Sequence, residues 1–114
     1  MKLIKLNAID STNEYIKLNK SFFSQNSLAV YSFNQTNGKG QRGKKWITEP
    51  YKNTCISFYY GVDKPSEYTL LKINLCTTLT VLEVLKSNDI TDLKIKWPND
   101  IMSGNRKIAV SLHI

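Results

Sequence analysis

The sequence is poor in cysteine and histidine, on which disulfide frameworks and many metal sites depend. It has two cysteines and one histidine among 114 residues. Cys55 and Cys76 lie in apolar surroundings and show neither the CxxC spacing of a metal site nor the density of a disulfide scaffold. We therefore expect both to be reduced, buried thiols, and we assign no role to His113.

Long hydrophobic runs, internal repeats and low-complexity tracts are also missing. No apolar stretch of signal-peptide length follows Lys2 and Lys5, and we expect no segment to approach the roughly 20 residues of a membrane helix. An apolar content of 41% excludes the collagen-like, coiled-coil and strongly disordered classes. The sequence predicts one small cytoplasmic domain over residues 1–114, with no membrane association.

Acidic residues are scarce, with 9 against 16 basic ones and a net charge of +7. The excess lies in residues 35–52 and 93–107, and the remaining charges cancel. Two confined basic segments indicate an anionic ligand held between them rather than a uniformly basic surface. A module that binds single-stranded nucleic acid is an alternative, because positive charge together with Trp46 and several tyrosines would suit it.

Short strands and helices alternate along the chain, which predicts a mixed α/β sandwich. Strands are predicted at 3–6, 28–33, 54–60 and 93–97, followed by a hairpin over 101–114. A first helix over 14–20 is preceded by several residues that can cap it, and Ser11 with Glu14 matches a capping box. Residues 34–53 have no apolar period and are predicted to be a long loop.

A second predicted helix begins at residues 65–66 and ends at Asn88 and Asp89. Its apolar residues recur at helical spacing, and we expect this face to cover a sheet. The members of the face are Tyr68, Leu71, Leu75, Leu79 and Leu82.

The long loop contains a glycine-rich segment, 38–43, that reads literally as GxGxxG. A dinucleotide-binding fold would require its last glycine to open a helix, but residues 44–53 have no helical period and contain Pro50. Glycines and interleaved cations can still form an anion-binding concavity, and Trp46 is placed to stack on a base. A solvated surface loop is the alternative interpretation.

A second motif, residues 96–100, combines a cation, an aromatic ring, a proline, an amide and a carboxylate. Asn99 can read the edge of a base, and Asp100 can hold a metal ion or position a nucleophile. The predicted hairpin would return Lys107 to this motif. A plain β-turn with Trp97 in the core is the alternative.

These segments, in this order, resemble the catalytic domain of biotin protein ligases. The resemblance covers nearly the whole chain. It rests on Ser11-Thr12-Asn13, on Gln35-Thr36 with the glycine segment and Trp46, on Lys96-Trp97-Pro98-Asn99-Asp100, and on Lys107-Ile108-Ala109.

The resemblance implies an α+β fold with a mixed sheet, the N-terminal portion of a catalytic domain like those of class II aminoacyl-tRNA synthetases and biotin ligases. It implies an ATP-dependent ligase that adenylates biotin and transfers it to a lysine of a biotin carboxyl carrier protein, with Mg²⁺ on the phosphates. Biotin would contact Ser11, Thr12, Asn13, Gln35, Gly38 and Lys39. ATP would contact Gly40, Gln41, Arg42, Gly43, Lys44, Trp46 and Asn99. Lys107 and Asp100 would be catalytic, and Asp100 would also help to hold Mg²⁺.

The chain departs from the family pattern at several positions. Lys39 and Lys44 replace arginines, Gln41 stands where another arginine is usual, and Val110 replaces a glycine. We expect a weaker hold on the adenylate at Gln41 and a narrower biotin pocket at Val110. An incomplete or inactive ligase fragment and a lipoate ligase-like enzyme are further alternatives. No DNA-binding helices precede Met1, so we expect no DNA partner, and a homodimer is one option for the assembly.

Overall fold

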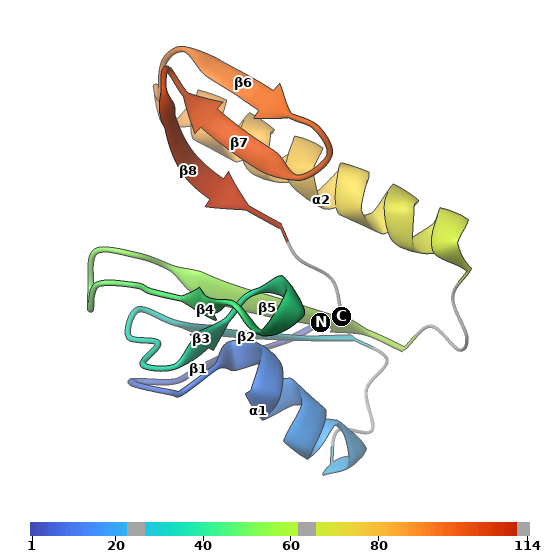
Figure 1. Cartoon of the computed structure of the whole chain (residues 1–114). Helices are drawn as coiled ribbons and strands as arrows, with labels where there is room; N and C mark the ends of the chain where they lie inside the picture. Colours follow the sequence, from blue (N-terminus) through green and yellow to red (C-terminus); the bar gives the residue numbers. More distant parts are fainter. Residues whose placement is uncertain (23–26, 62–65, 112–114) are drawn as a thin grey trace. The chain divides into compact units, whose positions relative to one another are not determined.

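The computed structural model describes residues 1–22, 27–61 and 66–111 of the 114-residue chain. Contacts divide the chain into two compact units, Met1–Asp63 and Lys64–Ile114. A three-stranded sheet lies in each unit (Figure 1). The single domain expected over residues 1–114 stays a prediction.

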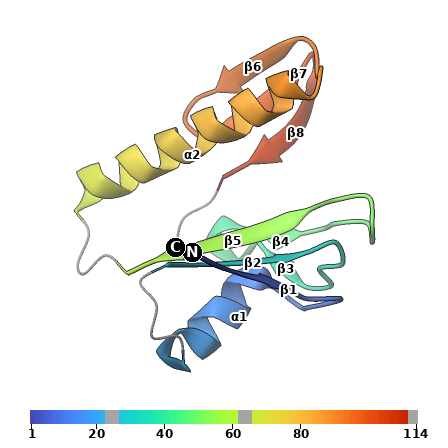
Figure 2. The same cartoon turned by 180° about the vertical axis from the view of Figure 1, so that it is seen from behind.

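The first unit contains a mixed sheet whose order is β1-β2-β5. Strands β1 (Lys2–Lys5) and β2 (Ser27–Ser32) run parallel, and β5 (Cys55–Tyr60) pairs antiparallel with β2. Helix α1 (Thr12–Asn19), followed by a short 3-10 helix (Lys20–Phe22), connects β1 to β2 and lies along one face of the sheet (Figure 2). These elements confirm the strands and the helix predicted here.

The core of this unit lies between α1 and the sheet. Ile16 of α1 packs with Leu28 and Val30 of β2, whose exposed fractions are 0%. Burying each of these side chains contributes roughly 1.5–3 kcal/mol before the conformational entropy is subtracted. The core therefore anchors the first turn of α1, where several of the predicted site residues lie, against the middle of the sheet.

The loop predicted over residues 34–53 contains a small hairpin at 38–46, which the prediction lacks, while residues 47–53 form no helix or strand, as expected. Strand β3 (Gly38–Lys39) pairs antiparallel with β4 (Lys45–Trp46), and a short 3-10 helix (Gln41–Gly43) forms the tip. Arg42 and Gly43 have positive φ angles of 57° and 75°, which reverse the chain. Strands of two residues are too short to show an alternating apolar pattern, and the sequence therefore gives no sign of them.

The second unit contains helix α2 (Glu67–Ser87) and an antiparallel sheet of order β6-β7-β8. The strands are β6 (Leu93–Lys96), β7 (Asp100–Ser103) and β8 (Arg106–Val110). Ser66 caps α2, its Oγ accepting a hydrogen bond from the backbone of Thr69 at 3.1 Å. The predicted hairpin turn is confirmed, with Gly104 at a φ of 57°. The remainder of the predicted strand, residues 112–114 with His113, lies outside the described residues.

Helix α2 packs on β6 and β7, but only part of the predicted face is covered, with Leu75 and Leu82 half-buried. Tyr68, Leu71 and Leu79 are 67%, 40% and 52% exposed, whereas Asn74 and Thr78 are buried. Leucine, isoleucine and valine occur on most of the circumference of α2, and a helical spacing can therefore be drawn along more than one face. In such a helix the packing partner selects the buried face.

The length of α2 also corrects the expectation that no segment approaches that of a membrane helix. With 21 residues, α2 is long and apolar enough to cross a membrane by length and composition alone, the one such helix in the described part of the chain. A core helix of a soluble protein meets the same criterion.

Both cysteines are free thiols, but only one of them is shielded. Cys55 on β5 is half-buried, and this burial raises the pKa of its thiol, while a hydrogen bond with the Thr48 side chain acts in the opposite direction. Cys76 on α2 is exposed, so its predicted burial is wrong. The reason is the rotation of α2, which turns this position away from β6 and β7.

Candidate functional site

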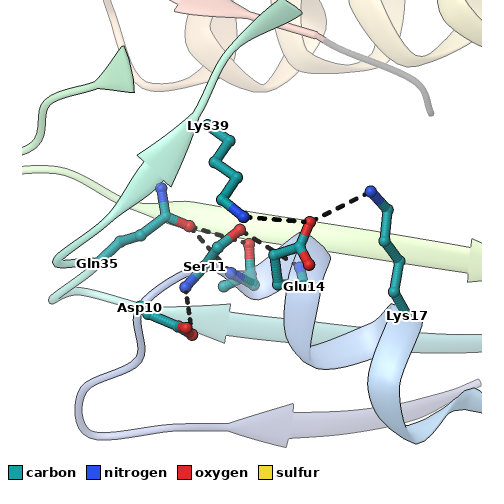
Figure 3. Close-up of polar contacts among 7 residues, drawn as sticks. Asp10, Ser11, Glu14, Lys17, Gln35 and Lys39 are labelled. Carbon is teal, nitrogen blue, oxygen red and sulfur yellow. Dashed lines mark hydrogen bonds and ion pairs between the residues drawn. The ribbon is translucent and has the colours of Figure 1, made fainter. Parts of the chain in front are cut away.

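The first turn of α1 begins at an N-cap that uses two successive side chains. Ser11 has an extended backbone, and its Oγ accepts a hydrogen bond from the Glu14 amide at 3.3 Å. The Ser11 amide donates to Oδ1 of Asp10 at 2.8 Å (Figure 3). The N-cap half of the predicted capping box is therefore present, while the return bond from Glu14 is replaced by Asp10.

Gln35 and the N-terminus of α1 are joined by a polar network. Oε1 of Gln35 accepts hydrogen bonds from the amide of Thr12 at 3.0 Å and from its Oγ1 at 3.3 Å. Thr12 Oγ1 also lies 2.7 Å from Ser57 Oγ, which in turn donates to Oδ1 of Asn13. The network thus connects four side chains from α1, β5 and the segment after β2.

Two members of this network are buried, so their hydrogen bonds must be satisfied within the protein. Thr12 and Ser57 are 3% and 7% exposed, and buried polar groups of this kind stabilise a fold only when they are hydrogen-bonded. Because Oε1 of Gln35 faces Thr12, the amide Nε2 of Gln35 points out of the network and donates to no residue that the structure describes. The network thus fixes one amide donor at its edge, and a placed polar group of this kind can orient a small polar ligand.

Ser57 is a site residue that sequence reasoning missed. The alternation of side chains along β5 places Ser57 and Tyr59 on the face that α1 covers and Phe58 on the other. A serine on the buried face of an otherwise aromatic and aliphatic strand is the signal that could have identified it.

Gly38 lies where the hairpin approaches Gln35 most closely. A Cβ atom at Gly38 would lie 2.5 Å from the backbone oxygen of Trp46 and 2.6 Å from Nε2 of Gln35. No side chain fits there without displacing one of these atoms. Glycine is therefore required by close approach, and Gly38 and Gln35, both predicted biotin contacts, are neighbours in space.

The hairpin carries several cations, which differ in their partners. Lys39 Nζ lies 3.9 Å from Oε1 of Glu14, whereas Arg42 and Lys44 are exposed and form no ion pair within the described residues. The amide of Gly40 donates to the backbone oxygen of Lys44 at 2.6 Å, which closes the tip. The side chain of Gln41 lies outside the described part of the structure. Free cations on a closed tip can attract an anion.

In the second unit, Asp100 of β7 and Lys107 of β8 form an ion pair, although the strand register pairs Lys107 with Met102. Their Oδ2 and Nζ atoms are 3.2 Å apart, and the Asp100 side chain is 17% exposed. The predicted return of Lys107 to the motif at 96–100 is confirmed by this contact. A carboxylate that is largely shielded from water holds the ammonium group at a defined position on the sheet.

Asn99 and Trp97 complete this motif. Asn99 Nδ2 donates to the backbone oxygen of Ser111 at 2.7 Å, and the backbone amide of Ser111 donates to the backbone oxygen of Asn99 at 3.1 Å. Asn99 thus braces the chain after β8. The β-turn alternative is therefore partly confirmed, since residues 97–99 form a turn and Asn99 bonds to backbone, but Trp97 is 70% exposed and its expected place in the core is wrong.

The predicted site residues therefore form two groups. Those expected to contact biotin, together with Gly40 to Trp46, lie in the first unit. Asn99, Asp100 and Lys107 lie in the second unit. A single site formed by both groups stays a prediction.

A protein-made magnesium site does not fit the residues present. The described part of the chain holds no group of three or more histidine, cysteine or acidic residues that could bind a metal ion. Asp100, the predicted ligand, is engaged by Lys107.

Comparison with known proteins assigns the chain to a family. Residues 6–113 match the sequence model of the biotin/lipoate A/B protein ligase family. The chain belongs to this family. A structure of Leishmania major biotin protein ligase in complex with biotinyl-5-AMP is similar over 97% of this chain and 51% of that chain, with a TM-score of 0.73 and 26% identity. A second structure, with biotin, has a TM-score of 0.74 over 97% of this chain and 50% of that chain at 24% identity, which supports the fold alone.

Curated members of the ligase family agree with this assignment. The bifunctional ligase/repressor BirA of Salmonella typhimurium is 29% identical over 104 residues, and that of Escherichia coli is 27% identical over the same length. The matches cover 91% of this chain and 32% of each relative, so the chain spans about a third of their length. The predicted α+β fold of a biotin ligase catalytic domain is confirmed.

Proposed function

We propose that this chain is the biotin- and ATP-binding part of a biotin protein ligase. The observation that carries the proposal is the buried network of Thr12, Gln35 and Ser57, closed by Gly38. It holds the Gln35 amide as a fixed hydrogen-bond donor, which the ureido oxygen of biotin can accept from. The similarity to a biotin protein ligase solved with biotinyl-5-AMP supports the same ligand.

The reaction has two steps in this proposal. In the first, a carboxylate oxygen of biotin attacks the α-phosphorus of ATP, and the bond to pyrophosphate breaks. In the second, the uncharged ε-amine of a carrier-protein lysine attacks the biotinyl-adenylate carbonyl, AMP leaves with the bonding electrons, and the new amide nitrogen releases a proton to water. The first step brings a carboxylate to a phosphate, and the second develops negative charge on the carbonyl oxygen and on the departing AMP, so fixed cations that meet this charge lower the barrier.

Lys107 is our choice for that cation. Its ammonium group is held 3.2 Å from Asp100 and is 45% exposed at the side chain, so it combines a defined position with access to a ligand. Asp100 orients Lys107 in the ligand-free chain. The cations of the hairpin at 38–46 would neutralise the phosphates and exclude water from the adenylate.

Biotin-dependent exchange of pyrophosphate into ATP tests the proposal. We expect exchange with the wild-type chain and a loss of at least tenfold in Lys107→Ala, because adenylation would lose its main cation. Circular dichroism of both proteins checks that each is folded. A folded wild-type chain with no exchange would contradict a self-sufficient adenylating unit and favour an incomplete ligase fragment.

A lipoate ligase-like enzyme is the second candidate, since the matching family includes both ligase types. Replacing biotin by lipoate in the same exchange assay separates the two. Exchange that depends on lipoate and not on biotin would overturn the assignment to biotin. Steeply salt-dependent binding of oligonucleotides without exchange would instead favour a nucleic-acid-binding module.

A further inference from the structure

The carboxylate of Glu14 does not perform its expected capping role. Ser11, whose amide would receive it in a capping box, donates to Asp10 instead at 2.8 Å. Oε1 of Glu14 lies 3.2 Å from Nζ of Lys17 and 3.9 Å from Nζ of Lys39 (Figure 3). Its side chain is 26% exposed, about half the exposure of either lysine. Glu14 is therefore a shielded carboxylate available for another role.

Glu14 links α1 to the glycine hairpin, defined here as residues 38–46. In the parts of the chain that the structure describes, the pair Glu14–Lys39 is the one hydrogen bond or ion pair between the hairpin and α1. The other bonds that hold the hairpin are at its base, where Thr36 and Asn37 donate to backbone oxygens of Ile9 and Asp10 at 2.9 and 2.8 Å. Glu14 is thus placed to restrain β3 beyond that base.

Lys17 competes for the same oxygen. Its Nζ is closer to Glu14 Oε1 than that of Lys39, and it belongs to the same helix as Glu14. Removing Lys17 would leave the Glu14 charge to Lys39 alone. Removing the charge of Glu14 would release Lys39 altogether. The two substitutions therefore affect the hairpin in opposite directions, which an unspecific effect on α1 would not do.

We propose that Glu14 is a positioning residue: its carboxylate holds Lys39, and with it β3, against α1, so that Lys39 is in place to receive the anionic end of the ligand. The identity of that ligand as biotin rests on the proposed function. The restraint itself rests on the contact between Glu14 and Lys39. Because an exposed ion pair is weak, the effect is a shift of a few-fold in a local equilibrium.

Hydrogen exchange of the ligand-free protein tests the restraint without reference to activity. Glu14→Gln is expected to speed amide exchange in residues 38–46 by roughly two- to fivefold, which is the size of a surface ion pair. Lys17→Gln is expected to slow that exchange, because Lys39 then has the Glu14 carboxylate to itself. Glu83→Gln, which removes a comparable exposed pair with Lys86 at 3.8 Å on α2, is the matched control and should leave the hairpin unaffected. Equal exchange in wild type and Glu14→Gln would overturn the proposal.

Charge reversal and kinetics test the positioning of the ligand. Glu14→Lys combined with Lys39→Glu should restore slow exchange of the hairpin but not biotin binding, because Lys39 would no longer face the anion. In the pyrophosphate exchange assay, Glu14→Gln is expected to raise KM for biotin by roughly two- to fivefold with kcat nearly unchanged. An unchanged KM would overturn the positioning role. A wild-type chain without biotin-dependent exchange would contradict the proposed function, and the hydrogen exchange result would then decide the restraint alone.

Discussion

Replacing Gly38 by alanine gives a direct test of the site, because the structure shows what the new methyl group would meet. The added Cβ would lie 2.5 Å from the Trp46 backbone oxygen, 2.6 Å from Gln35 Nε2 and 3.1 Å from Trp46 Cβ. Two of these neighbours belong to the residue that pairs with Gly38 in the hairpin, and one belongs to the polar network. Either β4 or Gln35 must move.

The expected loss of stability follows from two opposing effects. Overpacking of this kind costs about 1–3 kcal/mol, and the lower entropy of the unfolded chain with alanine returns about 0.4–1 kcal/mol. A net loss of about 1–2 kcal/mol remains. At roughly 4–8 °C per kcal/mol for a unit of this size, the Tm should fall by about 4–16 °C.

Gly40→Ala is the matched control in the same hairpin. Its Cβ would meet Cβ and the backbone oxygen of Lys44 at 3.4 Å, the edge of ordinary van der Waals contact, and its φ is not positive. The Tm of Gly40→Ala should therefore stay within about 4 °C of wild type.

Thermal melts by circular dichroism measure the stability of both variants, and titration calorimetry measures biotin affinity below the transition. Gly38→Ala should bind biotin up to about tenfold more weakly, because the amide of Gln35 is displaced and one hydrogen bond is lost. A Gly38→Ala protein as stable as wild type, or a Gly40→Ala protein destabilised to the same extent, would refute the argument from close approach.

Three further predictions concern the two cysteines and Gln41. Cys76 should react with iodoacetamide faster than Cys55 at pH 8, because burial raises the pKa of the Cys55 thiol and so lowers its thiolate fraction. Equal alkylation rates of the two cysteines, measured by mass spectrometry, would contradict this. Folding raises the pKa of the Cys55 thiol, so the un-ionised thiol favours the folded state fully below the ordinary thiol pKa, and this contribution is lost as the pH rises through the raised value. Thermal melts of Cys55→Ser should therefore lack this decline in Tm at high pH. Gln41→Arg should slow the release of biotinyl-adenylate, because arginine adds a charged, bidentate partner for phosphate. An adenylate off-rate equal to that of wild type in a stopped-flow chase would refute this role for position 41.

Most elements of the fold could be predicted because each depends on its own residues. The N-cap at Ser11, the strand at 55–60 and the hairpin turn at Gly104 follow from local preferences that act within a few residues. The hairpin of β3 and β4 could not be predicted, because its two-residue strands are formed by pairing with each other and have no pattern of their own.

The site was predicted in its residues but not in its contacts. The motifs identified Thr12, Gln35 and Gly38, yet Ser57 was missed because it reaches the network only when β5 pairs with β2. Glu14 was expected to serve the cap and instead contacts Lys39. Side chains that meet across 20 or more residues depend on pairing and burial, which neighbouring residues do not encode.

By itself, the sequence determined the order of the elements, the positions of the motifs and the family to which they belong, because capping, turn formation and motif chemistry are properties of short segments. Only the tertiary structure decided which face of α2 is buried, where the carboxylate of Glu14 points and which hydroxyl groups surround Gln35. In each case several arrangements satisfy the local preferences equally well. The choice among them is made by the free energy of packing one element against another.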